Sequence, residues 1–214
     1  MSNVSQFASA DLTAGQLNAI VKKLGGHDEA LRFLRGETIV AEPQRKWREE
    51  NGIIYFSVTS DGTTGEEWIK RLPQRGFVVR HHTRSALCSK DFKPTSGVTT
   101  EIAILVGSRF KEDDLINRNI RAFAAERKLE APNAEVACLI RDKFSDEEIE
   151  AMGLWSIVVM HESIKDFEDV QVLLSVDRGD GGCSLSACFG KPGDTRSRED
   201  GFAFAAPVQV SSQI

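Results

Sequence analysis

The apolar residues near the amino end recur with the period of a helix. From Leu17 to Leu24 they lie on one helical face, with Thr13 in place for an N-cap and Gly25–Gly26 for a stop. The same spacing returns between His27 and Arg35, directly after this short glycine turn. The pattern therefore predicts a helical hairpin.

We expect residues 1–50 to comprise a frayed tail and this hairpin, packed on a core that residues 51–214 form. The first ten residues are mostly small and polar, which is typical of a chain end without fixed structure. The polar stretch Ala41–Asn51 is expected to be a linker or a surface helix.

The strongest strand signal is Ile53–Val58, a continuous apolar, β-branched and aromatic run. Such a run is typical of a strand buried on both faces, so we expect it inside the sheet, hydrogen-bonded on both sides. A loop of small residues, helical spacing in Glu66–Arg75 and a second strand at Phe77–Val79 follow. This order predicts a parallel βαβ unit.

Helices and strands continue to alternate before the pattern changes in the last third. We expect helices over 83–89, 112–129 and 132–144, one more helix that Ser145 caps, and strands over 101–106 and 155–160. Strands are then expected at 170–176, 183–189 and 202–210, with a hairpin turn at Asp177–Gly182. The sequence thus predicts an α/β fold: an at least partly parallel central sheet with flanking helices, the N-terminal helical hairpin and antiparallel C-terminal strands. One mixed sheet of the α+β class is the alternative.

Composition places the chain among ordinary globular proteins, since 41% of its 214 residues are hydrophobic, 28% are charged and the net charge is −5. The basic run Arg45–Arg48 is flanked by glutamates. Only Arg32 and Arg35 lie on the second helix, too few cations for a helix-turn-helix that binds DNA phosphates. No apolar run reaches the ~20 residues that span a bilayer, and the start lacks a signal sequence. We therefore expect a soluble, cytoplasmic protein without membrane or nucleic-acid partners.

Cysteine and histidine do not form a metal-binding pattern. The cysteines are Cys88, Cys138, Cys183 and Cys188. They lack metal-ligand spacing, and in the cytoplasm we expect them to be reduced, without a disulfide. The pair His81–His82 follows a predicted strand, where α/β sheets place ligands, and fits either acid–base work or a solvated strand end. We expect no metal and no cofactor.

The best candidate for a binding site is the loop after the first strand. Its candidate residues are Ser60, Asp61, Gly62, Thr63 and Thr64. Because the loop opens a helix, its amides and hydroxyls would converge where the helix dipole favours a phosphate or carboxylate. The same residue types also cap a helix and form its turn without any ligand. Both interpretations stay open, and capping is the one we favour.

This stretch resembles the first motif of the haloacid-dehalogenase-like phosphatases, in which an apolar strand ends in Asp-x-Asp-Gly-Thr. The matching residues are Thr59–Thr63. The resemblance implies phosphoryl transfer to a carboxylate nucleophile, yet Thr59 stands in the place of that carboxylate. Asp61 alone remains for acid or base work, and we find neither a strand-end lysine nor later paired aspartates to hold magnesium.

A wider resemblance covers most of the chain from about residue 12. Several segments look like an uncharacterised family of bacterial proteins: Leu24–Gly26, Arg32–Glu37, Phe56–Gly65, Phe92–Thr100 and Asp200–Phe204. The resemblance implies a bacterial origin and makes both threonine- and glycine-containing loops features of the fold. It implies no activity.

The relation between these two loops depends on strand direction. The first loop leaves the carboxyl end of its strand, whereas Pro94–Thr100 enters the amino end of the strand at 101–106. Antiparallel strands would let the loops form one polar pocket from Ser60, Asp61, Thr63, Thr95, Ser96 and Thr99. We expect parallel strands, which place the two loops at opposite ends of the sheet.

Two classes of function follow. One is a non-catalytic binding or interaction protein, a homo-oligomer included, whose C-terminal strands and helical hairpin provide contact surfaces. The other is an enzyme or sensor that binds a small anionic, phosphate-bearing ligand at Asp61–Gly65. A concave pocket at that loop would favour the second class, and a filled loop the first. We expect the first class, because no catalytic machinery is visible in the residues.

Overall fold

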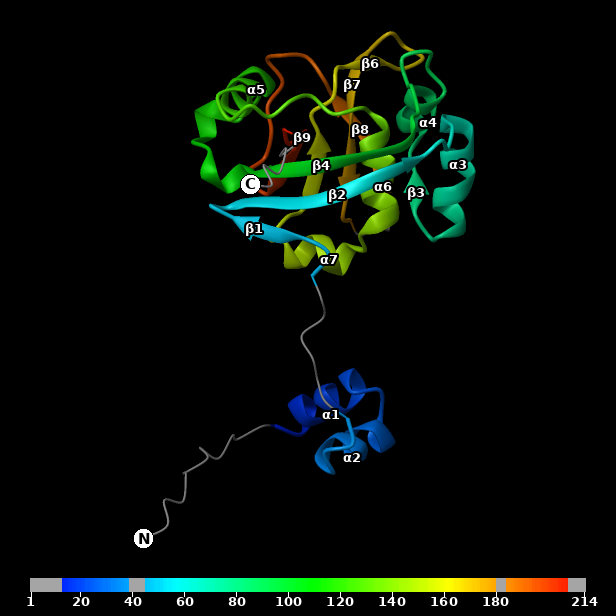
Figure 1. Cartoon of the computed structure of the whole chain (residues 1–214), viewed down its shortest axis with the longest axis vertical. Coiled ribbons are helices and arrows are strands. Elements are labelled where there is room, and N and C mark those ends of the chain that lie inside the picture. Colours follow the sequence, from blue (N-terminus) through cyan, green and yellow to red (C-terminus); the bar gives the residue numbers. More distant parts are fainter. Residues whose placement is uncertain (1–12, 39–44, 180–183, 208–214) are drawn as a thin grey trace, which may run out of the picture. The chain divides into compact units, whose positions relative to one another are not determined.

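The computed structural model describes residues 13–38, 45–179 and 184–207, which belong to two compact units, Met1–Arg45 and Lys46–Ile214 (Figure 1). Each unit is described by itself. Residues 180–183 of the predicted hairpin turn and residues 208–210 of the predicted last strand lie outside the described residues.

The first unit contains the helices α1 (Ala14–Lys23) and α2 (His27–Leu34). Thr13 caps α1: its hydroxyl accepts from the Gln16 amide, and the Gln16 side chain accepts from the Thr13 amide. Gly25 and Gly26 have φ of 98° and 113°, which lets the chain turn sharply between the helices. The predicted hairpin, cap and stop are confirmed.

The second unit consists of short helices around one sheet. Its α-helices are α3 (Gly65–Gln74), α4 (His81–Leu87), α5 (Asn117–Ala125), α6 (Glu135–Lys143) and α7 (Asp146–Ala151), with 3₁₀ turns η1 (Gly107–Arg109) and η2 (Glu112–Asp114). Its strands are β1 (Arg48–Glu50), β2 (Ile53–Asp61), β3 (Val78–Val79), β4 (Ser96–Val106), β5 (Ser156–Val159), β6 (Ile164–Lys165), β7 (Gln171–Asp177), β8 (Ser184–Phe189) and β9 (Asp200–Ala205). The expected elements are present, including α7 with its Ser145 cap.

Across the described residues, the strands form one mixed sheet in the order β1-β2-β4-β9-β5-β7-β8-β3, and β6 pairs with β7. The pairs β5–β9 and β3–β8 are parallel, and the other pairs are antiparallel. The α/β class, the partly parallel central sheet and the antiparallel pairing of β7 with β8 are therefore confirmed.

The predicted βαβ unit is wrong, because β3 pairs with β8 at the far end of the strand order and not beside β2. Both edges of β2 are taken by antiparallel neighbours, β1 and β4. The hairpin between β1 and β2 turns at Asn51 and Gly52, whose φ values of 53° and 70° are those of a type I′ turn. The part of Ala41–Asn51 that forms β1 is thus neither linker nor surface helix.

We expected both faces of β2 to be buried, but only one face of its second half is. Phe56 and Val58 are buried, whereas Ser57 and Thr59, which alternate with them, are exposed. Pairing with β1 covers Ile53–Tyr55, and for the second half of β2 the strand pairing found among the described residues is that with β4. Interior pairing is therefore confirmed for the first half of the strand.

Strands β2 and β4 are antiparallel, which corrects our expectation of parallel strands. Their register pairs Thr59 with Thr99 and Asp61 with Ser96. The loop after β2 and the loop before β4 therefore lie at the same end of the sheet. This is the arrangement in which their polar side chains can meet.

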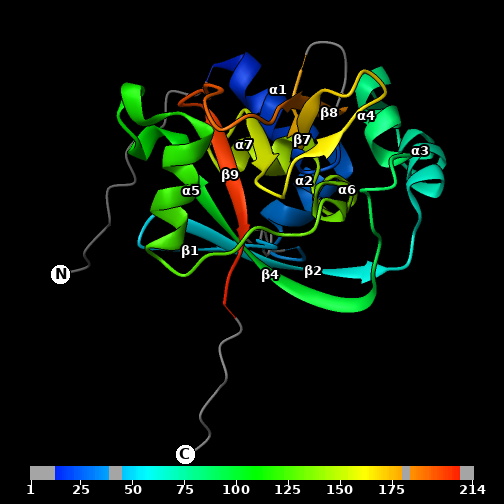
Figure 2. The same ribbon diagram turned by 90° about the horizontal axis from the view of Figure 1, so that it is seen from above.

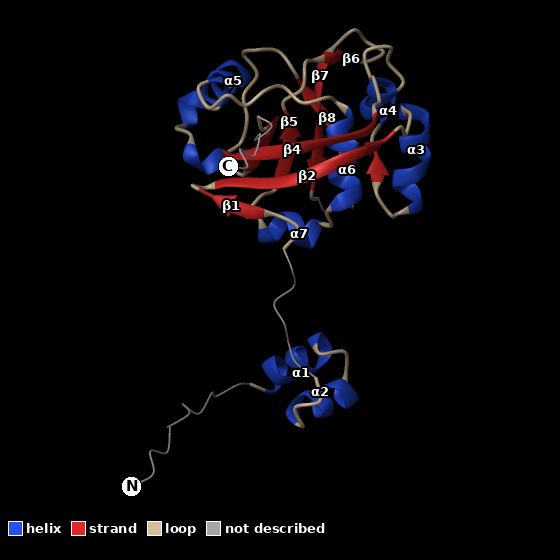
Figure 3. Ribbon diagram, in the orientation of Figure 1, coloured by secondary structure: helices blue, strands red, loops and turns tan. Residues whose placement is uncertain are grey.

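Helix α6 lies inside the curve of the sheet and contacts β2, β5, β7 and β8. Figures 1 and 3 show β2 and β4 crossing β7 and β8 steeply, with α6 between them. One apolar cluster, including Ile140 of α6, fills this face, and a second, including Ile120 of α5, fills the other. Figure 2 shows α5 and α6 on opposite sides of β9. The sheet thus has a core on each face.

Candidate functional site

The residues predicted at the end of β2 form a closed polar network with the loop before β4. The buried Ser60 hydroxyl accepts from the Val98 amide at 3.1 Å, and its oxygen lies at hydrogen-bonding distance, 2.8 Å, from the hydroxyl oxygen of Thr95. The buried Glu135 carboxylate accepts from both the amide and the hydroxyl of Thr95. Thr59 and Thr99 also share a hydrogen bond, at 2.9 Å. The two loops are brought together, with their hydroxyls bonded to each other.

The loop amides that could bind an anion donate to protein atoms instead. The Gly62 amide donates to the Thr95 carbonyl at 2.9 Å, the Thr63 amide to the Asp61 carboxylate at 3.1 Å, and the Thr64 amide to Glu67 at 2.8 Å. Thr64 and Glu67 form a complete capping box at the start of α3. This geometry is that of a helix cap.

The charge at this loop is already balanced. Hydrogen bonds from the Thr63 hydroxyl and from Arg71 lower the pKa of Asp61 to about 2. Arg71 also donates to Asp142, to which Arg75 is bonded as well. A cavity of about 350 Å³ borders these groups, and both of its carboxylates and its arginine are already paired. Lys143 also lines this cavity, but an anion that binds Arg71 would have to displace one of its two carboxylates.

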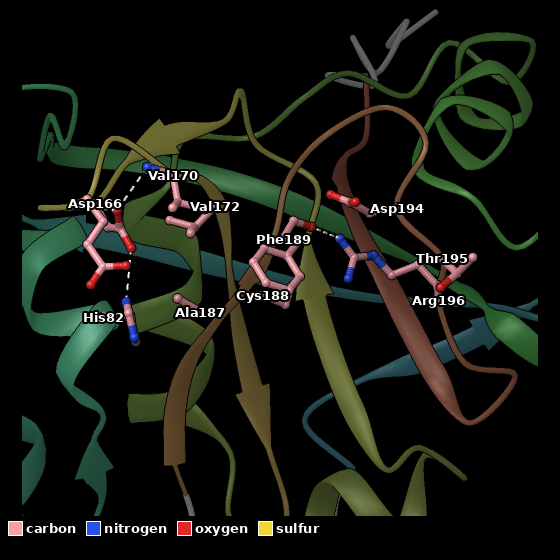
Figure 4. Close-up of a pocket in the computed structure, with 11 residues that line it drawn as sticks. His82, Asp166, Val170, Val172, Ala187, Cys188, Phe189, Asp194, Thr195 and Arg196 are labelled. Atoms are coloured by element: carbon pink, nitrogen blue, oxygen red, sulfur yellow. Dashed lines mark hydrogen bonds and ion pairs between the residues drawn. The ribbon is translucent and has the colours of Figure 1, made fainter.

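A larger cavity, of about 620 Å³, lies between α4, the turn from β6 to β7, the end of β8 and the loop before β9 (Figure 4). Figure 4 shows His82 and Asp166 on one side and Arg196 on the other, with Val172 and Phe189 between them. The lining residues are His82, Asp166, Glu168, Val170, Val172, Ala187, Cys188, Phe189, Asp194, Thr195 and Arg196. An apolar floor with a few polar groups at its margins is typical of a small-ligand pocket.

His82 is held by a buried carboxylate. Its Nδ1 lies 3.0 Å from Oδ2 of Asp166, whose side chain is only 1% exposed. The other carboxylate oxygen accepts from the amides of Glu168 and Val170 at 2.9 and 3.0 Å. Burial raises the pKa of Asp166, but the hydrogen bonds from His82 and the two amides outweigh it and lower the pKa. The charged carboxylate accepts the Nδ1 hydrogen, which leaves Nε2 of His82 for other partners.

Arg196 is fixed on the opposite side of the pocket. Its Nε donates to the side chain of Asn117 in α5 at 2.8 Å, and its Nη2 donates to the carbonyl of Phe189. The guanidinium also lies beside the Cys188 thiol, whose pKa it lowers, and no ion pair with a carboxylate of the described residues involves it. A positioned guanidinium suits a carboxylate or phosphate group.

Two of the described thiols, those of Cys138 and Cys188, are poor nucleophiles. Burial raises the pKa of Cys188 to about 11 and raises that of Cys138 well above its usual value. Cys88, Cys138 and Cys188 carry free thiols, and Cys183 lies outside the described residues. In the part of the chain that the structure describes, no group of His, Cys, Asp or Glu side chains is arranged to hold a metal ion, and no helix is long and apolar enough to cross a membrane.

The sequence singled out His82 but missed its partners. Asp166 lies 84 positions away, in a turn with no distinctive motif, and Arg196 follows still later in an irregular loop. Only the pairing of strands brings these segments together. No protein-family model, curated protein or solved structure matches this chain.

Proposed function

We propose that this chain is a binding protein and that the cavity between His82 and Arg196 is its ligand site. The observation that carries the proposal is the pocket itself: a fixed guanidinium faces a carboxylate-held imidazole across an apolar floor. Such a pocket fits a ligand with an apolar body and an acidic group near Arg196. The floor would bury the apolar body, at ~25 cal/mol per Å².

Binding is favoured over catalysis by the chemistry at the pocket. His82 offers Nε2 as a base, but the thiol that lines this pocket is that of Cys188, which burial keeps protonated by raising its pKa to about 11. A base without an activated nucleophile supports recognition better than group transfer.

The Asp61–Gly65 loop is the second candidate, for a small phosphate-bearing ligand. The meeting of the Ser60 and Thr95 hydroxyls at one end of the sheet favours it. Its occupied amides and paired carboxylates favour the cap instead, so we place it second. The cytoplasmic location and the homo-oligomer expected from the sequence remain proposals, and light scattering tests the latter.

The test is a binding titration with small carboxylates that have apolar bodies, such as phenylacetate and N-acetyl-leucine. Saturable binding is expected, and Arg196→Gln should weaken it about ten- to hundredfold, the range for a lost hydrogen bond to a charged group. Arg198→Gln is the matched control, because Arg198 is exposed in the same loop, donates to the Ser108 carbonyl and does not line the pocket. An equal loss in both variants, or no binding to the parent protein, would refute the proposal.

A further inference from the structure

Among the described residues, one edge of β8 has no strand partner along its second half. β3 pairs only with Ser184 and Leu185, because the chain leaves the sheet after Val79 and enters α4. The amide of Arg80 donates to the Leu185 carbonyl at 3.3 Å, which is the last main-chain hydrogen bond on that side among the described residues. Helix α4 contacts β8, but within the described residues the remainder of β8 has no strand partner on this edge.

The direction of the main-chain groups on β8 follows from two hydrogen bonds. The Leu185 carbonyl points to β3, and the Gly190 amide donates to Gln171 at the start of β7 at 2.8 Å. Since main-chain groups alternate between the two sides of a strand, those of Ala187 and Phe189 point away from β7. The Phe189 carbonyl accepts from Arg196, which agrees with this direction. The Ala187 amide and carbonyl and the Phe189 amide have no partner among the described residues.

This edge of β8 borders the cavity described above. Ala187 and Phe189 both line the cavity, and the Phe189 side chain is 66% exposed. Figure 4 shows the end of β8 between Asp166 and His82 on one side and Arg196 on the other. A ligand beside β8 would thus have main-chain donors and acceptors along it and charged groups on both flanks.

We propose that the ligand is an extended peptide that adds a strand to β8 where β3 ends, with a carboxylate facing Arg196. The inference rests on the proposed function of the pocket. A small acid could use the guanidinium and the apolar floor, but only a peptide also pairs with two main-chain positions that are two residues apart. The guanidinium of Arg196, which its bonds to Asn117 and Phe189 hold beside β8, supplies the complementary charge.

Amide hydrogen exchange at Ala187 and Phe189 tests the proposal directly. The probes are acetyl-Ala-Leu-Ala-Leu with a free carboxyl end and acetyl-Ala-Glu-Ala-Leu-amide. Comparing them shows whether the site binds a terminal or a side-chain carboxylate. Whichever peptide binds should slow exchange at both amides about tenfold or more, as expected for new main-chain hydrogen bonds. The same peptide N-methylated on its inner amides should bind about tenfold or more weakly.

Two protein variants complete the test. Phe189→Pro removes the amide donor and should bind the peptide about tenfold more weakly than Phe189→Leu, which keeps both the amide and an apolar side chain at this position. If Phe189→Pro does not fold, the N-methylated peptide carries the same information. Binding of N-acetyl-leucine that depends on Arg196, with no slowing at Ala187 or Phe189 by either peptide, would overturn this inference and leave the proposed function standing. Absence of binding by every acid and peptide would overturn both.

Discussion

Acidification is expected to destabilise the second unit through His161. The ring is buried, at 1% exposure, and both nitrogens are engaged: Nε2 accepts from the Leu174 amide at 2.9 Å, and Nδ1 lies 2.6 Å from the Glu162 carbonyl. Protonation would cost the hydrogen bond from Leu174 and place a charge inside the core. Burial, together with the nearby charge of Arg121, therefore lowers the pKa of His161 to about 4.

The magnitude follows from linkage. The unfolded chain binds a proton at His161 with a pKa of about 6.5, whereas the folded chain does so only near 4. The full stability is present above about pH 6.5, and as the pH falls the unfolded state binds the proton first. The free energy of unfolding should therefore fall by about 1.4 kcal/mol per pH unit, or about 3 kcal/mol by pH 4.

Urea unfolding at a series of pH values, for the parent protein and for His161→Gln, measures this loss of unfolding free energy. Glutamine keeps an acceptor for the Leu174 amide and does not titrate, so other acidic groups cancel in the difference between the two proteins. The advantage of the parent over the variant should shrink by about 3 kcal/mol between about pH 7 and pH 4. Two parallel stability curves would refute the reasoning.

Three further substitutions test the local structure, each by thermal or urea unfolding. Thr63→Ala removes the hydroxyl that donates to Asp61 and should lower stability by about 1 kcal/mol. Because Thr64 caps α3, phosphate compounds should leave the melting temperature of the parent unchanged; a rise with phosphate would contradict the cap. Gly65→Ala should cost about 3 kcal/mol or more, because the new Cβ would overlap the Leu87 carbonyl; a neutral variant would show that the two elements are not in contact. Asp146→Ala should cost about 3 kcal/mol, because it leaves the fully buried Arg141 unpaired, and adding Arg141→Met should recover part of this loss. An unchanged midpoint for Asp146→Ala would show that the ion pair contributes nothing.

Features that depend on neighbouring residues were predictable from the sequence. Thr13 and Ser145 each carry the spacing of a capping box, and both caps are present. Asn51–Gly52 carried an equally local signal for a hairpin, which we missed because the run after it was interpreted as a doubly buried strand. The error at β2 was therefore one of interpretation, since the information was in the sequence.

Long-range pairing was not predictable in the same way. The helical spacing of Glu66–Arg75 predicts α3 correctly, but nothing near Val78 and Val79 indicates that their partner is β8. The candidate site could not be predicted for the same reason, because His82 and Asp166 meet only through this order of strands. A residue type can be identified as chemically capable from the sequence, whereas its partner depends on the topology.

The most direct test of the central claim is a crystal structure of the protein with a carboxylate that binds it, such as phenylacetate or N-acetyl-leucine. We expect the ligand between His82 and Arg196, with its carboxylate on the guanidinium of Arg196 and its apolar body on Val172 and Phe189. A ligand found at the Asp61–Gly65 loop, with the cavity beside β8 left empty, would contradict the account.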